Sequence, residues 1–290
     1  MKSGDLIRLK GQEIDTLEKR YSVLMSVYKK ENPEYLDKSI RSMMDQSVKP
    51  ADFVIVKDGP LTVELDAIID KYTALFPELF QIIALEKNGG LGPALATGIQ
   101  KAKYEIVARM DSDDISAPTR CEEELAILDL YPDLGAVGTF EAEFIDNPSE
   151  VVSIHRVPED SDSIYRFMKR RCALLHPTVM YKKDAVISSG NYHSVHLYED
   201  YDLFARMILE HKIKSYNIQK PLYYIRISED FYKRRGGIKY ARTVLKFKYC
   251  ILKKGYMSIW DFIVSGVGQA IVCILPNSVR KYIYMKLLRK

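Results

Sequence analysis

The chain has 290 residues, of which 47% are hydrophobic and 28% are charged. This composition excludes a disordered chain and supports a sizeable core, arranged as one large domain or as one domain with an appendage. The 4 cysteines stand far apart with no Cys-x-x-Cys pair, which argues against a zinc site or a disulfide framework and predicts a reducing, cytoplasmic compartment. Residues 1–20 are charged and lack an apolar stretch, so we expect a polar extension there and no signal peptide.

The net charge of +4 hides a strong asymmetry along the chain. Residues 231–290 contain 14 Lys and Arg but a single acid, Asp261, and so carry +13, whereas residues 1–230 carry −9. Such a basic tail favours a polyanionic partner, which is either nucleic acid or an anionic membrane surface.

The residues between these charges distinguish between the two possible partners. Residues 257–276 are apolar and aromatic, are interrupted by Asp261, and are short for a spanning helix, which needs about 20 unbroken apolar residues. We therefore predict a C-terminal helical segment that associates with an anionic membrane, and no nucleic-acid partner. The alternative is an ordinary C-terminal helix that packs into the core and keeps a solvated basic face.

Strands and helices alternate along the first part of the chain. Apolar, β-prone runs predict buried parallel strands at 21–28, 53–56, 80–85 and 104–110, and helical spacing predicts helices at 33–47, 62–76 and 92–102. This alternation predicts a Rossmann-like, mostly parallel α/β sheet flanked by helices. Ligands bind such sheets at the carboxyl ends of the strands, and several acids of this chain lie there.

The fourth strand ends in Asp111, Asp113 and Asp114. Like charges at this spacing repel one another and remain together stably when a cation lies between them. Mg²⁺ or Mn²⁺ is bound in this way, by one or two carboxylates together with the oxygens of a phosphorylated substrate. The pattern therefore predicts a metal–diphosphate site; a helix N-cap would explain Asp114 or Ser116 but not three acids.

A glycine-rich loop, residues 88–94, joins the third strand to the third helix. Glycines allow the backbone to approach a ligand closely, and a helix N-terminus favours a phosphate group. The loop matches neither the Gly-x-Gly-x-x-Gly pattern nor the Lys-Ser/Thr phosphate loop, so taken alone it indicates only a tight turn.

Taken in order, these blocks resemble the inverting glycosyltransferases of family 2, which have the GT-A fold, over about residues 21–230. In that family, the first strand holds uracil and ribose, a second-strand Asp recognises the base, and an Asp-x-Asp motif binds the metal. By this resemblance the nucleotide-binding residues are Ser26, Val27, Tyr28, Glu31, Asp58, Asn88, Gly90, Leu91, Ala94, Asp111 and Ser112, and the metal ligands are Asp113 and Asp111. One departure is Lys57, where many members carry a second Asp.

The second half of the chain extends the resemblance. The segment around Glu199 and Asp200 is similar to a family block that begins a helix beside the acceptor. The resemblance implies that Asp200 is the general base for the acceptor hydroxyl, with Glu199 as the other candidate. It also implies that His176 lines the donor-sugar and acceptor cleft. Arg226 and the basic run 232–235 would neutralise the leaving diphosphate, unless that run is simply a solvated loop.

The resemblance implies a metal-dependent transfer, with Mn²⁺ or Mg²⁺, from a UDP-sugar to a saccharide acceptor. The basic tail suggests an acceptor linked to undecaprenyl diphosphate at the inner face of the cell membrane, as in bacterial O-antigen or exopolysaccharide synthesis. We expect a nucleotide-binding half at 21–114, an acceptor half at 115–230 and a separable basic segment at 231–290. The alternatives are a sugar nucleotidyltransferase of similar fold, although residues 29–33 lack its glycine-rich loop, and a non-enzymatic membrane-binding adaptor.

Overall fold

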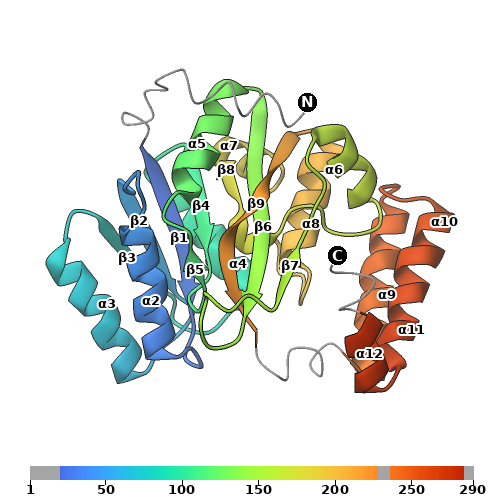
Figure 1. Ribbon diagram of the computed structural model, residues 1–290, viewed down its shortest axis with the longest axis horizontal. Helices are drawn as coiled ribbons and strands as arrows, with labels where there is room; N and C mark the ends of the chain where they lie inside the picture. Colours follow the sequence, from blue (N-terminus) through green and yellow to red (C-terminus); the bar gives the residue numbers. More distant parts are fainter. Residues whose placement is uncertain (1–19, 228–235, 284–290) are drawn as a thin grey trace.

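The computed structural model describes residues 20–227 and 236–283 (Figure 1). The predicted N-terminal extension, apart from Arg20, and the basic run 232–235 lie outside the described residues.

The first half of the chain is a parallel sheet with helices in the connections. Every strand and helix predicted for this half is present, with ends that differ by a few residues. The elements are β1 (Tyr21–Val27), α2 (Pro33–Met44), β2 (Asp52–Lys57), α3 (Val63–Leu75), β3 (Phe80–Ala84), α4 (Leu91–Lys101) and β4 (Ile106–Met110). The strands lie in the order β3-β2-β1-β4, and each neighbouring pair is parallel. Side chains of β1 and β2 are buried on both faces, which explains their continuous apolar sequences.

The second half extends the same sheet with strands of both directions. Its elements are β5 (Ile115–Ser116), α5 (Arg120–Leu130), β6 (Leu134–Phe144), β7 (Ser153–His155), α6 (Ser161–Met168), a 3-10 turn (His176–Thr178), β8 (Met180–Lys182), α7 (Lys183–Ser188), α8 (Glu199–Ala205) and β9 (Lys214–Arg226). The order continues β4-β8-β6-β9-β5, with β7 beside β6. Because β8 is antiparallel to both β4 and β6, the sheet is mixed, which agrees with the predicted mostly parallel α/β sheet flanked by helices.

Helices cover both faces of the sheet, so the core has two apolar layers. One layer is formed where α2, α3 and α5 pack on the sheet, with Leu36, Leu65 and Leu125 among its buried residues. The other is formed by α4 together with α6, α7 and α8. This arrangement leaves the carboxyl ends of β1, β2 and β4 open at one edge, which is the place where a ligand binds in such sheets (Figure 1).

The C-terminal helices are α9 (Ile238–Lys253), α10 (Ile259–Phe262), α11 (Gly268–Ile274) and α12 (Asn277–Ile283). A π-helical turn (Ile263–Val267) joins α10 to α11. Helix α9 buries Ala241, Val244, Phe247 and Ile251 in the same apolar layer as α4 and α8. No helix in the described part of the chain is long and apolar enough to cross a membrane.

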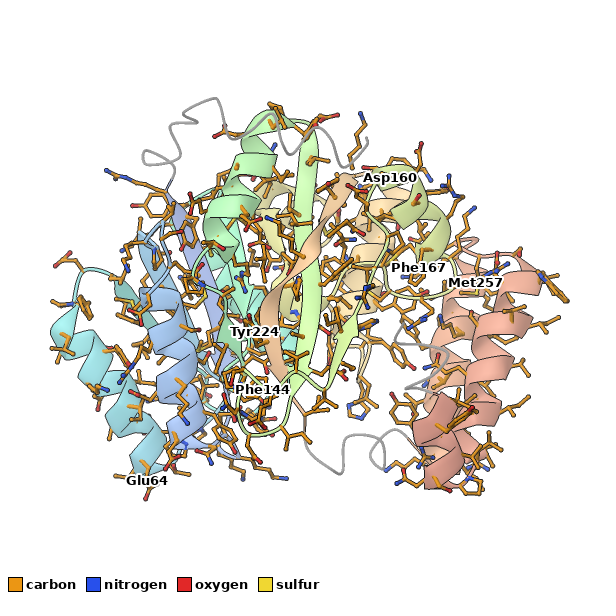
Figure 2. The ribbon with its side chains drawn as sticks, viewed as in Figure 1. Glu64, Phe144, Asp160, Phe167, Tyr224 and Met257 are labelled. Atoms are coloured by element: carbon orange, nitrogen blue, oxygen red, sulfur yellow. The ribbon has the colours of Figure 1, made fainter. Side chains whose placement is uncertain are left out.

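The junction between these helices and the rest of the molecule is apolar and closely packed. The rings of Phe247 and Tyr198 stack with centroids 4.1 Å apart. Figure 2 shows Phe167 of α6 and Met257 at this junction, and both contribute to the shared apolar layer. The packing of α9 therefore supports the alternative of a C-terminal helix built into the core, whereas the expected separability of 231–290 has no support in these contacts.

Candidate active site

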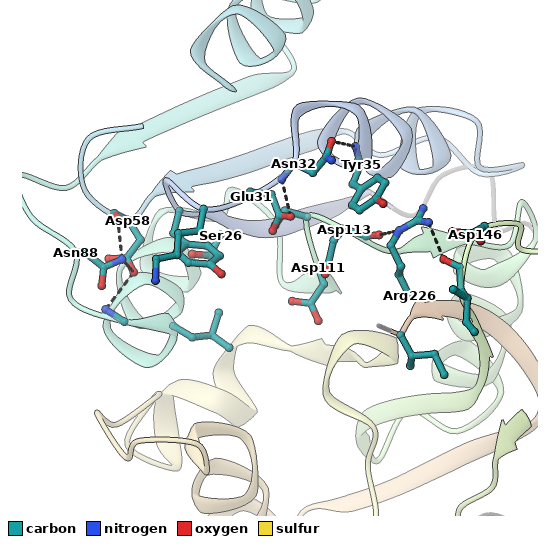
Figure 3. Close-up of a pocket in the computed structure, with 17 residues that line it drawn as sticks. Ser26, Glu31, Asn32, Tyr35, Asp58, Asn88, Asp111, Asp113, Asp146 and Arg226 are labelled. Atoms are coloured by element: carbon teal, nitrogen blue, oxygen red, sulfur yellow. Dashed lines mark hydrogen bonds between the residues drawn. The ribbon is translucent and has the colours of Figure 1, made fainter. Parts of the chain in front are cut away.

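A cavity of about 790 Å³ lies at the carboxyl ends of β1, β2 and β4, where the sequence places its acids (Figure 3). Most of the predicted site residues line it: Ser26, Tyr28, Glu31, Asp58, Asn88, Gly90, Leu91, Asp111, Ser112, Asp113 and Arg226. Segments far apart in the sequence thus meet at one site, as the topological argument predicts.

Asp58 holds the glycine-rich loop beside the cavity. Its Oδ1 accepts a hydrogen bond from the Gly89 amide at 2.7 Å, and its Oδ2 accepts from the Asn88 side chain at 2.8 Å and from the Gly90 amide at 3.1 Å. The neighbouring Gly59 has φ +83°, and a Cβ there would lie 2.6 Å from the Asn88 nitrogen. Asp58 therefore fixes the loop in addition to facing the cavity. Fewer of its lone pairs remain to accept hydrogen bonds from a nucleotide base than the sequence suggests.

Asp111 lies at the end of β4 and is paired with a buried cation. The Arg109 side chain is fully buried, and its Nη2 donates to Asp111 Oδ1 at 2.5 Å. The Asp111 amide donates to the hydroxyl of Tyr223 at 3.1 Å. The Asp111 carboxylate is one third exposed and points into the cavity (Figure 3). One of its oxygens is therefore committed to Arg109, and the other remains for a ligand.

Asp113 is the carboxylate that most needs a counter-ion. Burial raises its pKa to about 7, and the neighbouring Asp111 and Glu31 carboxylates add to the shift. A raised pKa of this origin means that the ionised form lacks a compensating charge. A divalent cation would supply that charge, so the donor set fits the predicted metal. Within the described residues, no cluster of three or more His, Cys, Asp or Glu is arranged to bind a metal by protein ligands alone.

Asp114 has a structural role. It is almost fully buried and accepts from the Tyr223 hydroxyl at 3.0 Å and from the Arg226 amide at 2.8 Å, so it joins β4 to β9. The suggestion that Asp114 or Ser116 caps the following helix is wrong, because α5 has its N-cap at Thr119.

The first turn of α2 closes another side of the cavity. The Asn32 side chain caps this helix by accepting from the amides of Glu34 and Tyr35. Glu31, just before the cap, accepts from the Ser112 hydroxyl at 2.7 Å. The contact joins the segment after β1 to the acidic segment after β4, as a shared nucleotide site requires.

Arg226, at the end of β9, lies between two aromatic rings. Its guanidinium carbon is 3.9 Å from the centre of the Tyr35 ring and 4.5 Å from that of Phe144. The side chain donates to the backbone oxygens of Asp113 and Ile145 (Figure 3). This stacking fixes a positive charge beside the acidic segment.

Three predicted binding residues lie elsewhere. Val27 and Ala94 are fully buried in the apolar layers beneath the cavity, because their side chains point into the core. His176 is also buried, and its Nε2 is 2.9 Å from the Tyr192 hydroxyl. Burial and the charge of Arg109 lower the His176 pKa well below its ordinary value, so this ring is neutral. These three side chains do not line the cavity.

Glu199 and Asp200 form the first turn of α8, outside the cavity lining. The Tyr201 amide donates to Asp200 Oδ1 at 2.7 Å. Burial raises the Asp200 pKa to about 6, and the Glu199 charge adds to the shift. Burial also raises the Glu199 pKa. Asp202, in the same first turn, is paired with Arg206 at 2.9 Å.

Gly92 brings this first turn of α8 next to the cavity. A Cβ at Gly92 would lie 2.4 Å from the His193 carbonyl oxygen and 3.0 Å from Cγ of Glu199. Leu91, the preceding residue, lines the cavity. Glu199, one of the two candidates for the general base, therefore lies beside the residue that follows a lining residue of the cavity.

The sequence analysis missed several lining residues and one ion pair. The additional lining residues are Lys30, Asn32, Tyr35, Ile145, Asp146 and Ile227. Residues 145 and 146 carry no motif, and their position depends on how β6 pairs with β9. Arg109 did carry a signal, because an arginine within a buried strand requires a partner.

Comparison with known proteins identifies the family. The model for glycosyl transferase family 2 matches residues 22–188. The Escherichia coli UDP-Gal:alpha-D-GlcNAc-diphosphoundecaprenol beta-1,3-galactosyltransferase is 36% identical over 271 residues, which cover 93% of this chain and 97% of that enzyme. The amylovoran biosynthesis glycosyltransferase AmsE of Erwinia amylovora is 32% identical over 92% of this chain and 98% of its own.

Solved structures share the fold. The mannosyltransferase PcManGT from Pyrobaculum calidifontis, solved with GDP-Man and Mn²⁺, has a TM-score of 0.62 at 12% identity, over 98% of this chain and 86% of its own. The TarS fragment of S. aureus, residues 1–349 with UDP-GlcNAc, has a TM-score of 0.61 at 16% identity, over 93% of this chain and 76% of its own. Since the family model spans more than half of the sequence and full-length relatives exceed 30% identity, the chain belongs to glycosyl transferase family 2 and is a glycosyltransferase of GT-A-like fold.

Proposed function

We propose that this protein is a metal-dependent inverting glycosyltransferase that moves a sugar from a UDP-sugar to a saccharide on a lipid diphosphate. The observation that carries the proposal is the charge of the cavity. Among the described residues, its lining includes five carboxylates, Glu31, Asp58, Asp111, Asp113 and Asp146, and two cationic side chains, Lys30 and Arg226.

Arg109 neutralises one of these carboxylates, Asp111, and the remaining excess of negative charge favours a bound cation. A nucleotide diphosphate is an anion, and a site with an excess of carboxylates repels it. A divalent ion between the carboxylates and the diphosphate reverses the sign of the interaction. A nucleotide site lined by basic side chains would not need the metal. In an acidic site that binds no metal and no diphosphate, carboxylates of raised pKa would only destabilise the fold.

Asp113 and the free oxygen of Asp111 would hold the metal, with substrate oxygens and water as the remaining ligands. The bound ion would act as a Lewis acid on the departing UDP. Arg226 keeps a fixed positive charge next to Asp113, and its aromatic contacts prevent it from rotating away. Asp58 and the Gly89–Gly90 backbone shape the side of the cavity assigned to the nucleoside.

Asp200 is the proposed general base. Inversion requires one carboxylate to accept the proton of the acceptor hydroxyl as its oxygen attacks the anomeric carbon. A pKa of about 6 leaves Asp200 ionised at neutral pH and makes it a stronger base than an exposed aspartate. Glu199 remains the second candidate, since the same turn carries it and Gly92 brings its side chain closest to the rim.

The acceptor is proposed from the named relative. The E. coli enzyme of 36% identity acts on GlcNAc-diphosphoundecaprenol with UDP-Gal, and the AmsE relative belongs to amylovoran biosynthesis. Because the matches extend over nearly the whole of both chains, a saccharide on undecaprenyl diphosphate is the acceptor class proposed here, in surface polysaccharide synthesis.

The test is nucleotide binding followed by product analysis. Isothermal titration should show UDP binding that requires Mn²⁺ or Mg²⁺ in the unaltered protein and is lost in Asp113→Asn. A panel of UDP-sugars, incubated with a lipid-diphosphate GlcNAc and Mn²⁺, should yield one product with an added hexose by mass spectrometry. UDP binding of equal affinity with and without the metal would refute the assignment of Asp113.

A further inference from the structure

The helical run 259–274 exposes an apolar stripe. We define the stripe by its exposed side chains, Trp260 (65%), Ile263 (46%), Val264 (44%), Val267 (36%), Ile271 (56%) and Ile274 (60%). Their spacing of three or four residues places them on one side of the helix. Isolated exposed apolar residues are ordinary, but six on one helix face indicate an interaction surface.

The opposite side of this run packs against α9. Gly266, Ala270 and Cys273 are buried there. A Cβ at Gly266 would lie 3.2 Å from Cβ of Lys248, so the two helices approach closely at this point. The stripe therefore faces away from the core, and nothing in the described part of the chain covers it.

A basic stripe on α9 lies on the side of that helix next to α10. Lys239, Arg242, Lys246 and Lys253 are exposed in helical phase with Tyr249. The Tyr249 ring is 6.4 Å from the Phe262 ring of α10, which places this side of α9 next to the apolar helix. The surface thus combines cationic side chains with apolar ones and has a tryptophan near its edge.

Because the segment has almost no acidic side chains, it does not complement a partner surface that carries both positive and negative charges. Asp261 is the only acid among residues 231–290. It is occupied, since its carboxylate accepts from the Ser258 hydroxyl at 2.7 Å and from Arg170 at 2.6 Å. In a two-fold contact through this surface, a second copy of the chain would bring the same positive charge and would be repelled.

We propose that this surface docks on an anionic lipid membrane, with the apolar stripe among the headgroups and the α9 cations against lipid phosphates. Amphipathic helices with Trp on the apolar side and Lys or Arg on the polar side bind the membrane interface in this way. The proposal deepens the proposed function, because a lipid-linked acceptor has to be met at a membrane, but its evidence is the surface itself.

The docking helices are tied directly to the acceptor side of the active site. Lys248 of α9 donates to the Arg170 carbonyl oxygen at 2.6 Å and to the Tyr201 hydroxyl at 3.1 Å. Asp261 of α10 holds the side chain of the same Arg170. Tyr201 follows the proposed base, so docking fixes the orientation of α8 relative to the membrane.

Trp260 is the only tryptophan in the chain, and its fluorescence therefore tests the proposal directly. With the full chain, vesicles of phosphatidylglycerol and phosphatidylcholine should shift the emission to shorter wavelength, and brominated lipid should quench it. Vesicles of phosphatidylcholine alone should bind far more weakly. Each α9 cation changed to Gln, with Lys246→Gln as the first, should weaken binding by about fivefold in low salt.

A matched pair of variants separates the stripe from general surface hydrophobicity. Ile271→Asp should weaken vesicle binding by about tenfold or more, because one buried apolar side chain is lost. Val63→Asp, on the exposed N-terminus of α3 where the residue is 82% exposed, should leave it unchanged. Metal-dependent UDP binding should be normal in both variants, which keeps this test independent of the proposed reaction.

Two results would overturn the proposal. The first is an unshifted Trp260 emission with anionic vesicles. The second is concentration-dependent dimerisation, seen by sedimentation and abolished by Ile271→Asp, which would assign the stripe to a second copy of the chain.

Discussion

Arg109 and Asp111 form an ion pair of 2.5 Å in which the guanidinium is fully buried and the carboxylate faces the cavity. The described residues give the neighbouring Asp113 carboxylate no ion pair of this kind. Burial, together with the Asp111 and Glu31 charges, raises its pKa to about 7, although the Arg226 charge opposes the shift. In the absence of a metal, these two carboxylates therefore have opposite effects on stability. Asp111 compensates a buried cation and stabilises the fold, whereas Asp113 adds a buried anion and destabilises it.

The first prediction is that Asp111→Ala destabilises the metal-free protein and Asp113→Asn stabilises it. Asp111→Ala removes a hydrogen bond between charged groups, which is worth about 1.5–3 kcal/mol, and leaves Arg109 buried with less compensation. Asp113→Asn removes the desolvated charge. Thermal melts at pH 8 in excess EDTA measure both changes.

The pH dependence of the stability change in Asp113→Asn is the control for this prediction. The ordinary pKa of an aspartate, 3.8, applies to unfolded Asp113, and its folded pKa is about 7. The destabilisation caused by ionised Asp113 is therefore absent below pH 3.8, grows as the pH rises to 7, and is complete above that value. The gain in Asp113→Asn should vanish at pH 4, and an equal gain at both pH values would contradict this origin.

The second prediction concerns the base. Because only ionised Asp200 accepts a proton and its pKa is about 6, kcat/KM should fall about tenfold per pH unit below pH 6 and be level above it. Asp200→Asn should lower kcat by about two to four orders of magnitude, with little change in UDP affinity. Steady-state kinetics between pH 5 and 8, beside UDP titrations at the same pH values, measure both effects.

Glu199→Gln is the matched control for the base. It removes the adjacent carboxylate of the same helical turn and should retain most of the activity, with the acidic limb shifted to lower pH because one charge near Asp200 is lost. If Glu199→Gln is inactive and Asp200→Asn is active, the two roles are exchanged.

The sequence predicted the first half of the fold and the position of the site because both depend on local signals. The apolar runs of β1, β2 and β4 specify buried strands, and the residues just after these strands must meet at one edge. The Asp-x-Asp segment and the Asn88–Gly90 loop could therefore be assigned to one cavity, where the structure has them.

Where the structure places residues differently from the expectation, the cause is tertiary packing that the local pattern does not contain. Val27 and Ala94 lie in matching motif positions, but their side chains point into the core. Asp114 looks like its neighbours in the sequence, yet it bonds to β9, which lies more than a hundred residues away along the chain. The tail looks separable because of its charge, but α9 presents a different, apolar side to α8.

The third prediction is that Gly92→Ala impairs transfer more than nucleotide binding. An added Cβ would meet the His193 carbonyl oxygen at 2.4 Å and would displace the start of α8. Overpacking of this kind costs about 1–3 kcal/mol of stability and should lower kcat by moving Glu199 and Asp200. Kinetics at saturating donor and UDP titrations separate the two effects.

Gly98→Ala controls for simple overpacking of α4. Its Cβ would meet Leu24 at 2.3 Å and Val56 at 2.8 Å, on the core side of the same helix. It should lower the melting temperature at least as much as Gly92→Ala but reduce kcat less. Equal losses of kcat in the two variants would indicate that Gly92 serves packing alone.

The last prediction is that a chain ending at residue 235 does not fold, contrary to the separability expected from the charge pattern. Such a chain lacks Val244, Phe247 and Ile251, whose burial is worth about 1.5–3 kcal/mol each, and this sum approaches the whole stability of an ordinary domain, about 5–15 kcal/mol. It also lacks Lys248, whose amine donates to the Arg170 carbonyl and to the Tyr201 hydroxyl. Phe247→Ala in the full chain is the milder companion, since it deletes the ring that stacks on Tyr198 and should cost about 3–5 kcal/mol. Circular dichroism melts and metal-dependent UDP binding measure both proteins. A truncated chain that unfolds cooperatively near the melting temperature of the full chain would show that α9 is an attachment to the domain and not part of its core.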